Sequence, residues 1–274
     1  MAGAAVQETS GLAPSRRTDD LFWAHNDSGS GPVLHALGAD GRDRGRLRLT
    51  GATAEDWEDL ASFELDGRAW LLVADVGDNF ANRPHGVLHV VAEPDPATLA
   101  PGREQVAPVA WSLVFRYEDG PRDCEAVAVD PRDRSVWLLS KRDAPARLYR
   151  LPLAPAPRDQ PAVARFVVPV PGLPQPNALQ RRITQPLFAY RGQPTALDFS
   201  ADGSLAAVLT YGALVLYPRH PAEDWAAALA RPPRLLPAHA LPQAEAACFS
   251  RDGRSLYVCS ENSRRWLRYD RRQP

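Results

Sequence analysis

Lysine is almost absent from this chain of 274 residues: 31 of its 32 basic residues are arginine, and Lys141 is the single lysine. A codon bias toward arginine explains the ratio, so the place of the one lysine is the informative point. Net charge of either sign is also lacking, since the formal charge is −1. A near-neutral chain has no field that attracts nucleic acid. We therefore expect no nucleic acid partner. No run of 18 apolar residues occurs, so we also expect no membrane span.

Cysteine is too scarce for a disulfide scaffold, with three residues at Cys124, Cys248 and Cys259. Cys248 and Cys259 fall on adjoining strands of one predicted hairpin. A single bridge there and two buried free thiols both fit the sequence, and free thiols are favoured. No His or Cys pair has the spacing of a zinc site. The sequence also lacks a G-x-S-x-G elbow, an H-E-x-x-H motif and a glycine-rich phosphate loop before a helix.

A signal peptide is not visible at residues 1–6, where the sequence leads directly into the first predicted strand. We expect a secreted or periplasmic protein whose export signal is absent from this sequence. A cytoplasmic location stays open.

One short segment type occurs five times, each time at the start of a predicted strand. Each copy has an acid or amide first, an oxygen-bearing residue two positions later, and then small and apolar residues. The copies are residues 8–13, 56–61, 123–128, 193–198 and 243–248. The second positions lie 48, 67, 70 and 50 residues apart. Strand-based repeats of this period are typical of a β-propeller.

We therefore predict an all-β, five-bladed β-propeller that forms a single domain over residues 1–274. The predicted blades cover approximately residues 6–53, 54–120, 121–170, 190–240 and 241–274, with a loop insertion at 171–189. The alternative is a six-bladed propeller with a degenerate blade in that insertion. A short helix is predicted at 222–230 from its alanine content. The fifth blade runs out after its third strand, so its outer strand is either absent or supplied by residues before Met1.

The same position in every blade of a propeller points toward one central axis. Here these positions carry three carboxylates and two hydroxyls: Ser10, Glu58, Glu125, Thr195 and Glu245. Three glutamates around one axis repel one another unless a cation or protons neutralise them. All five donors are hard oxygens, which calcium prefers. We predict a calcium ion in the channel. The alternatives are a water-filled acidic channel and glutamates that bond to the backbone of neighbouring blades.

The second strand of each blade ends on the same face as these positions, and polar residues follow all five strand ends. We predict that Asp27, Asp78 and Glu261 orient a water molecule and that His25 is a general base. Lys141 would act beside them in catalysis by holding an anionic group. The predicted substrate-binding residues on this face are Asn79, Arg142, Tyr211 and Asn262. Lys141 has the alternative role of neutralising Glu125 or Asp123.

The ordered set Ser10, Glu58, Glu125, Thr195 and Glu245 resembles the calcium site of the calcium-activated nucleotidase (apyrase) family. In that family, serine and glutamate side chains from five blades hold a central calcium, and Thr195 stands here where the family has serine. The family's extended motifs around the nucleotide are missing. The segment 123–130, followed by 136–140, is similar to blade segments of β-propeller phytases, although the paired aspartates that open those enzymes are absent. The resemblance implies a calcium-centred propeller.

Three functions remain open at this point. The first is a calcium-dependent hydrolase of a small phosphoester or phosphoanhydride, acting as a monomer. The second is a non-catalytic propeller in which calcium is structural and the same face binds a ligand or a protein. The third is a lactonase or isomerase on the same scaffold, because propellers carry many unrelated functions.

Overall fold

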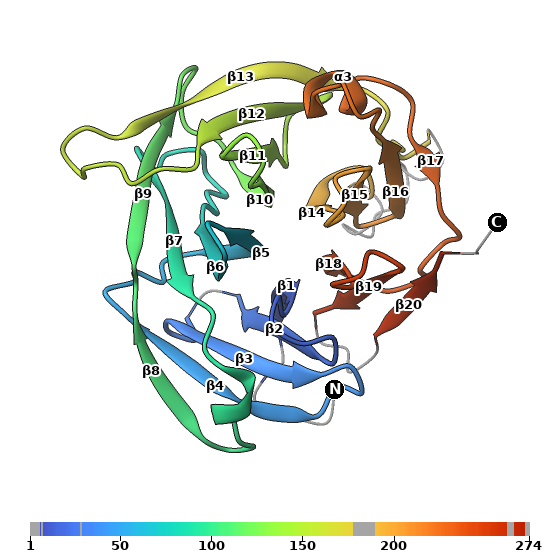
Figure 1. The fold of residues 1–274 in the computed structure, drawn as a ribbon. Coiled ribbons are helices and arrows are strands. Elements are labelled where there is room, and N and C mark those ends of the chain that lie inside the picture. The colour runs from blue at the N-terminus through green and yellow to red at the C-terminus, as the bar shows by residue number, and fades with distance from the viewer. Residues whose placement is uncertain (1–5, 7, 28, 178–189, 262–265, 272–274) are drawn as a thin grey trace.

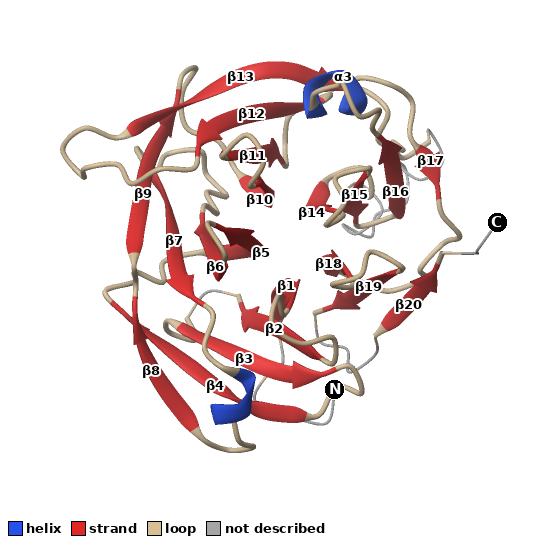
Figure 2. Cartoon of the chain, in the orientation of Figure 1, coloured by secondary structure: helices blue, strands red, loops and turns tan. Residues whose placement is uncertain are grey.

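The computed structural model describes residues 6, 8–27, 29–177, 190–261 and 266–271. Strands dominate this part of the chain and are arranged radially around a central opening (Figures 1 and 2). The helical elements in it are the 3-10 turn η1 (Pro96–Thr98) and the helix α3 (Trp225–Leu229). Neither is long enough to cross a bilayer. The predicted all-β propeller fold is confirmed.

The first sheet has the order β1-β2-β3-β4-β8. Its strands are β1 (Thr9–Pro14), β2 (Leu21–Asn26), β3 (Val33–Gly38), β4 (Asp43–Thr50) and β8 (Glu104–Pro108). The first four pair antiparallel in chain order. β8 comes from the next repeat and pairs parallel with β4, which the sequence did not predict. The outer edge of β4 is therefore covered by a later part of the chain.

The second and third repeats join into one eight-stranded sheet with the order β10-β11-β12-β13-β9-β7-β6-β5. The second repeat supplies β5 (Trp57–Leu65), β6 (Arg68–Asp75), β7 (Gly86–Ala92) and β9 (Trp111–Tyr117). The third supplies β10 (Cys124–Asp130), β11 (Ser135–Ser140), β12 (Ala146–Pro152) and β13 (Ala162–Val170). The two halves meet where β13 runs parallel to β9 at the periphery (Figure 1).

The fourth and fifth repeats form smaller sheets. The fourth contains β14 (Pro194–Phe199), β15 (Leu205–Thr210), β16 (Ala213–Pro218) and β17 (Arg234–Leu235). The fifth has β18 (Ala244–Phe249), β19 (Ser255–Ser260) and β20 (Leu267–Asp270). Within the described residues the fifth sheet stops after its third strand, as the sequence predicted. The predicted insertion 171–189 is described only for 171–177, which form a turn and loop.

The innermost strands contact one another in a closed ring with the order β1, β5, β10, β14, β18 and back to β1. Their side chains are almost all buried, and five apolar clusters fill the spaces between sheets. Strands buried on both faces must be nearly continuous in apolar or small residues, which explains the small residues of the repeat.

Asp59 ties three strands of this ring together. Its carboxylate accepts backbone N–H bonds from Leu60 on β5 at 2.8 Å, from Val127 on β10 at 2.7 Å and from Leu197 on β14 at 3.4 Å. Burial raises the pKa of Asp59, and the three N–H donors oppose that rise. A buried carboxylate thus takes up backbone donors that neighbouring inner strands cannot satisfy among themselves.

Two smaller predictions concern the helix and the cysteines. α3 begins after Asp224, whose carboxylate caps the Ala227 N–H at 2.8 Å, so the helix is shorter than predicted at its start. Cys124, Cys248 and Cys259 are all free and buried, and the structure thus supports the free-thiol interpretation. Burial raises the pKa of Cys124 to about 12, which disfavours a thiolate nucleophile there.

Candidate functional site

The five repeat positions occupy the same structural feature on the five inner strands. In each of the five repeats the pairing of the first strand with the second shifts register by one residue, and the skipped residue is the repeat position. These bulge residues are Ser10, Glu58, Glu125, Thr195 and Glu245. A β-bulge re-aims a side chain that regular alternation would place on a sheet face. The bulges thus place five oxygen-bearing side chains at the same end of the inner ring.

The two hydroxyls in this set link neighbouring inner strands. The Ser10 hydroxyl donates to the backbone oxygen of Glu58 at 2.9 Å and lies 3.3 Å from Glu58 Oε2. The Thr195 hydroxyl donates to the backbone oxygen of Ala244 at 2.8 Å. Both hydroxyls are buried. Their described contacts are structural, although an oxygen that donates its proton keeps lone pairs for a further partner.

Glu58 and Glu125 lie together with Asp123, which opens the repeat segment of the third blade. One carboxylate oxygen of each residue lies within 4.8 Å of the other two, and all three side chains are buried. Burial, followed by the charges of Asp56 and Asp27, raises the pKa of Glu58 well above its ordinary value. Glu125 Oε2 is buried and has no hydrogen-bond partner among the described residues.

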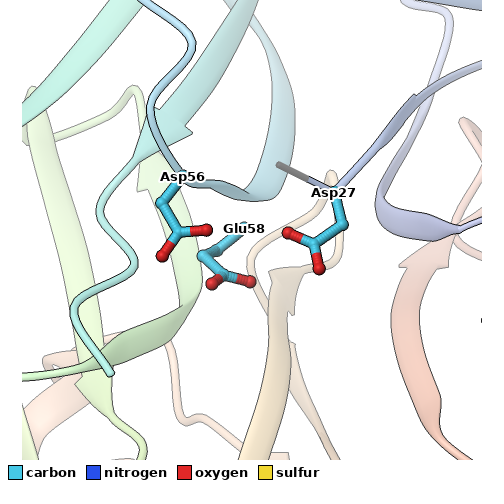
Figure 3. A group of neighbouring side chains, drawn as sticks. All are labelled: Asp27, Asp56 and Glu58. Carbon is cyan, nitrogen blue, oxygen red and sulfur yellow. The ribbon is translucent and has the colours of Figure 1, made fainter. Parts of the chain in front are cut away.

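A second acidic group shares Glu58 and lies nearer to solvent. Asp27, Asp56 and Glu58 also bring one oxygen each within 4.8 Å of one another, and Figure 3 shows their carboxylates facing a common space. Asp27 and Asp56 are half-buried. Burial and the charge of Asp27 raise the pKa of Asp56 to about 6. Glu58 therefore connects an inner and an outer group of carboxylates.

Gly77 leaves the room in which Asp56 and Glu58 meet. A Cβ atom at position 77 would lie 2.3 Å from Asp56 Oδ2 and 2.4 Å from Glu58 Oε1. The backbone of this loop is also fixed to the group, because the Gly77 N–H donates to the Asp56 backbone oxygen at 3.2 Å. Only glycine allows both carboxylates their present positions.

Asp75 organises the loop that presents Asp56. Its carboxylate accepts the N–H groups of Glu55 at 3.2 Å and Asp56 at 3.0 Å, and it pairs with Arg83 at 2.9 Å. These bonds lower the pKa of Asp75 despite its burial. Asp75 therefore fixes the conformation of the loop as an ionised carboxylate, and its oxygens are not left to bind a ligand.

The single lysine lies inside the ring. Lys141 Nζ pairs with Glu125 Oε1, and the side chains are only 7% and 6% exposed. The same ammonium lies 5.4 Å from the centre of the Tyr211 ring. Its charge also lowers the pKa values of Glu58, Glu245 and Glu261, against the larger effect of burial. Lys141 therefore serves as a cation for the ring, the alternative role that the sequence left open.

Glu245 closes the ring on the side of the fifth sheet. Burial raises its pKa to about 8, while Lys141 and a hydrogen bond from Tyr211 act in the opposite direction. Burial and this partnership raise the pKa of Tyr211. Tyr211 is thus a neutral hydroxyl that donates to Glu245, and its ring faces Lys141.

The residues predicted to orient water or bind substrate are largely engaged with the protein. Asp78 is buried and accepts the N–H groups of Asn82 and Arg83, both at 2.9 Å, so it shapes its own loop. Arg142 pairs with Asp123 at 2.6 Å and also donates to the Asn79 side chain. These contacts place Asn79 and Arg142 at the rim of the acidic site with their polar groups committed to one another.

His25 lies below the ring rather than at its surface. Its side chain is completely buried against Gly11 and the Trp57 ring, and burial lowers its pKa. A neutral, enclosed imidazole does not reach a substrate. Glu261 is half-buried at the rim and accepts a hydrogen bond from Gln243 at 3.0 Å, and burial and the charge of Asp27 raise its pKa. Asn262 falls outside the described residues.

Comparisons with known proteins identify only the fold. No family model and no curated protein matches the chain. Among solved structures, the nidogen/laminin complex matches with a TM-score of 0.50 and 12% identity over 97% of this chain and 76% of that one. Hydrazine synthase of Kuenenia stuttgartiensis has a TM-score of 0.44 and 11% identity over 96% and 71% of the two chains. The structure of U3-55K has a TM-score of 0.42 and 14% identity over 95% of this chain and 64% of that one. None of these three structures is named as a nucleotidase or a phytase.

The sequence did not single out three residues of the site as ligands or spacers. Asp56 and Asp123 are the first residues of their repeat segments, and their acidity was a visible signal. The sequence signal at Gly77 was weaker: it is a glycine between the acids Asp75 and Asp78. In each case the contact depends on a loop folding back over the bulge, which no spacing rule predicts.

Proposed function

We propose that this protein binds calcium at the mouth of its central channel and presents the cation to a small anionic molecule. The observation that carries the proposal is Glu58, which belongs to two groups of three carboxylates. The outer group includes half-buried Asp27 and Asp56 and thus suits a cation that keeps exchangeable waters. The inner group suits an enclosed cation.

Charge and hydrogen bonding both support a cation there. Glu125 Oε2 is buried without a described partner, and an unsatisfied buried oxygen is costly. Lys141 and Arg142 are paired with Glu125 and Asp123, whereas Asp56 and Glu58 form no ion pair among the described residues, so this part of the site holds more acid than base. Carboxylate oxygens without histidine or cysteine favour calcium over zinc or copper.

The reaction that best suits the outer group is hydrolysis of a small phosphoester or phosphoanhydride. A bound calcium would supply Lewis acidity and a template for the anion. Asp27 and Asp56 would hold and orient the attacking water from the solvent side, and Glu261 at the rim would assist.

A non-catalytic role for the same site is favoured by one observation: Arg142 and Lys141 are both neutralised by acids and offer little charge to a substrate.

Metal analysis of the purified protein, followed by turnover of a phosphatase and esterase panel with calcium or chelator, tests both statements. We expect stoichiometric calcium and chelator-sensitive turnover. Calcium without turnover would contradict the hydrolase and support the non-catalytic role. Absence of calcium, with a melting temperature that chelator leaves unchanged, would contradict the site itself.

A further inference from the structure

A cavity of about 440 Å³ lies at the end of the inner strands opposite to the acidic ring. Each ring residue is the second residue of its inner strand, whereas the cavity is lined by the last residues of these strands and the turns that follow. The walls include Phe63, Val129 and Phe199. This volume is in the range of small-molecule sites. The cavity is thus spatially distinct from the proposed calcium site and independent of it.

Arg16 lines this cavity, and hydrogen bonds fix both its side chain and its backbone. Its Nε donates to the backbone oxygen and the hydroxyl of Ser62, both at 3.0 Å. Its backbone N–H donates to Glu93 at 2.9 Å, and the buried Glu93 also accepts the indole N–H of Trp23. A guanidinium anchored through Nε keeps both terminal nitrogens for a planar partner.

Arg16 differs from the other two arginines of the cavity in lacking an ion pair. Arg132 pairs with Asp130 at 2.6 Å and Arg251 with Asp19 at 3.0 Å. No carboxylate among the described residues lies within ion-pair distance of Arg16, although its side chain is only partly exposed. An arginine fixed at a cavity wall, with no carboxylate at ion-pair distance, is suited to receive one from a ligand.

The acids around the cavity restrict which ligand fits. Asp198 lies near Arg16; burial raises the pKa of this carboxyl to about 6, and the charge of Arg16 acts in the opposite direction. Its oxygens accept the N–H groups of Phe199 at 2.9 Å and Phe249 at 2.8 Å. Glu64 and Asp252 line the cavity and are exposed. Their charges repel a polyanion such as a nucleotide, whereas a single carboxylate beside Arg16 is tolerated.

We propose that this cavity binds a small organic monocarboxylate, with the carboxylate on the Arg16 guanidinium and an apolar body against Phe63, Val129 and Phe199. The apolar walls contact the body of the ligand, and the arginine supplies selection for the acid.

Binding of 3-(4-fluorophenyl)propionate, followed by fluorine NMR of the ligand, tests the proposal on the full chain. We expect saturable broadening with wild type and about tenfold or greater weakening in Arg16→Gln, because a charge-assisted bidentate bond is lost. The uncharged amide of the same probe should bind wild type about tenfold more weakly than the acid.

Arg17→Gln is the matched control, because it removes the same charge from the adjacent, exposed position, which does not line the cavity. It should bind the probe as wild type does. Equal binding of acid and amide, no saturable binding to wild type, or equal weakening in both variants would overturn the proposal. The acid–amide comparison needs no variant and decides the matter if Arg16→Gln does not fold.

Discussion

Lys141 and Glu125 form a buried ion pair at the mouth of the central channel, although Glu125 Oε2 in the same carboxylate lacks a described partner. The ammonium thus neutralises part of a site that still holds excess acid. The Lys141 ammonium is one cation of this site. A metal ion would have to compete with it for the same carboxylate oxygens.

Removing either partner should destabilise the fold, because it leaves an uncompensated buried charge. We expect Lys141→Met to lower the free energy of unfolding by about 3–5 kcal/mol in chelator, and Glu125→Gln to lower it as well. The double variant should be more stable than the sum of the single losses predicts. Urea unfolding of the four proteins measures this, and strictly additive losses would show that the pair contributes no coupling.

Calcium should compensate for the missing lysine. Because Lys141→Met frees Glu125 Oε1, we expect this variant to bind calcium more tightly than wild type and to gain more thermal stability from it. Calorimetric titration measures the affinity. Weaker binding in Lys141→Met would mean that the lysine helps to build the cation site rather than competing with it.

The stability of the metal-free protein should depend on pH with a definite sign. Burial raises the pKa of Asp56 to about 6 and that of Glu245 to about 8, so the folded state holds protons that the unfolded state releases. Their contribution is complete below about pH 4 and is lost as pH rises through these folded-state values. Burial lowers the pKa values of His25, His35, His89 and His239, so their contribution to stability has the opposite sign and is complete above about pH 7. In chelator we therefore expect the melting temperature to fall as pH rises from about 7 through about 8, where Glu245 titrates. Calcium, which requires ionised carboxylates, should raise it more at the higher pH, and scanning calorimetry checks both trends.

We expect Gly77→Ala to abolish calcium binding. Its effect on the free energy of unfolding should be less severe. The added methyl would overlap both Asp56 Oδ2 and Glu58 Oε1, so the outer group cannot keep its arrangement. Gly51→Ala is the control: its φ of 83° makes alanine strained by about 1–2 kcal/mol, but no atom lies within 4 Å of the new methyl. Equal calcium affinities in the two variants would contradict the role assigned to Gly77.

Asp59→Asn should weaken the inner ring. An amide group cannot accept at both of its ends, so at least one of the N–H groups of Leu60, Val127 and Leu197 loses its partner. We expect a loss of about 1–3 kcal/mol in the free energy of unfolding. Asp66→Asn, in the exposed turn between β5 and β6, is the comparison and should have little effect. Hydrogen exchange should accelerate at one or more of the Leu60, Val127 and Leu197 N–H groups in the Asp59 variant and at none of them in the Asp66 variant.

The repeat allowed the fold and the five inner-ring positions to be predicted from the sequence, whereas the bulges at these positions were seen only in the structure. Strand periodicity and turns fix each hairpin locally, and equal positions of equal hairpins must meet at one end of the inner ring. That reasoning gave Ser10, Glu58, Glu125, Thr195 and Glu245. It did not give the parallel pairing of β8 with β4, because residues 104–108 pair across the boundary between two repeats.

The sequence by itself thus determined the propeller, the inner ring of oxygen-bearing side chains and the presence of one lysine on that face. Tertiary structure alone decided that Lys141 enters the ring, that Asp78 and His25 are enclosed, and that Asp56 and Asp123 join the carboxylate groups. The reason is physical: hydrophobic and turn patterns are local and repeat along the chain, whereas charge pairing and burial depend on loops from different blades approaching within a few ångströms.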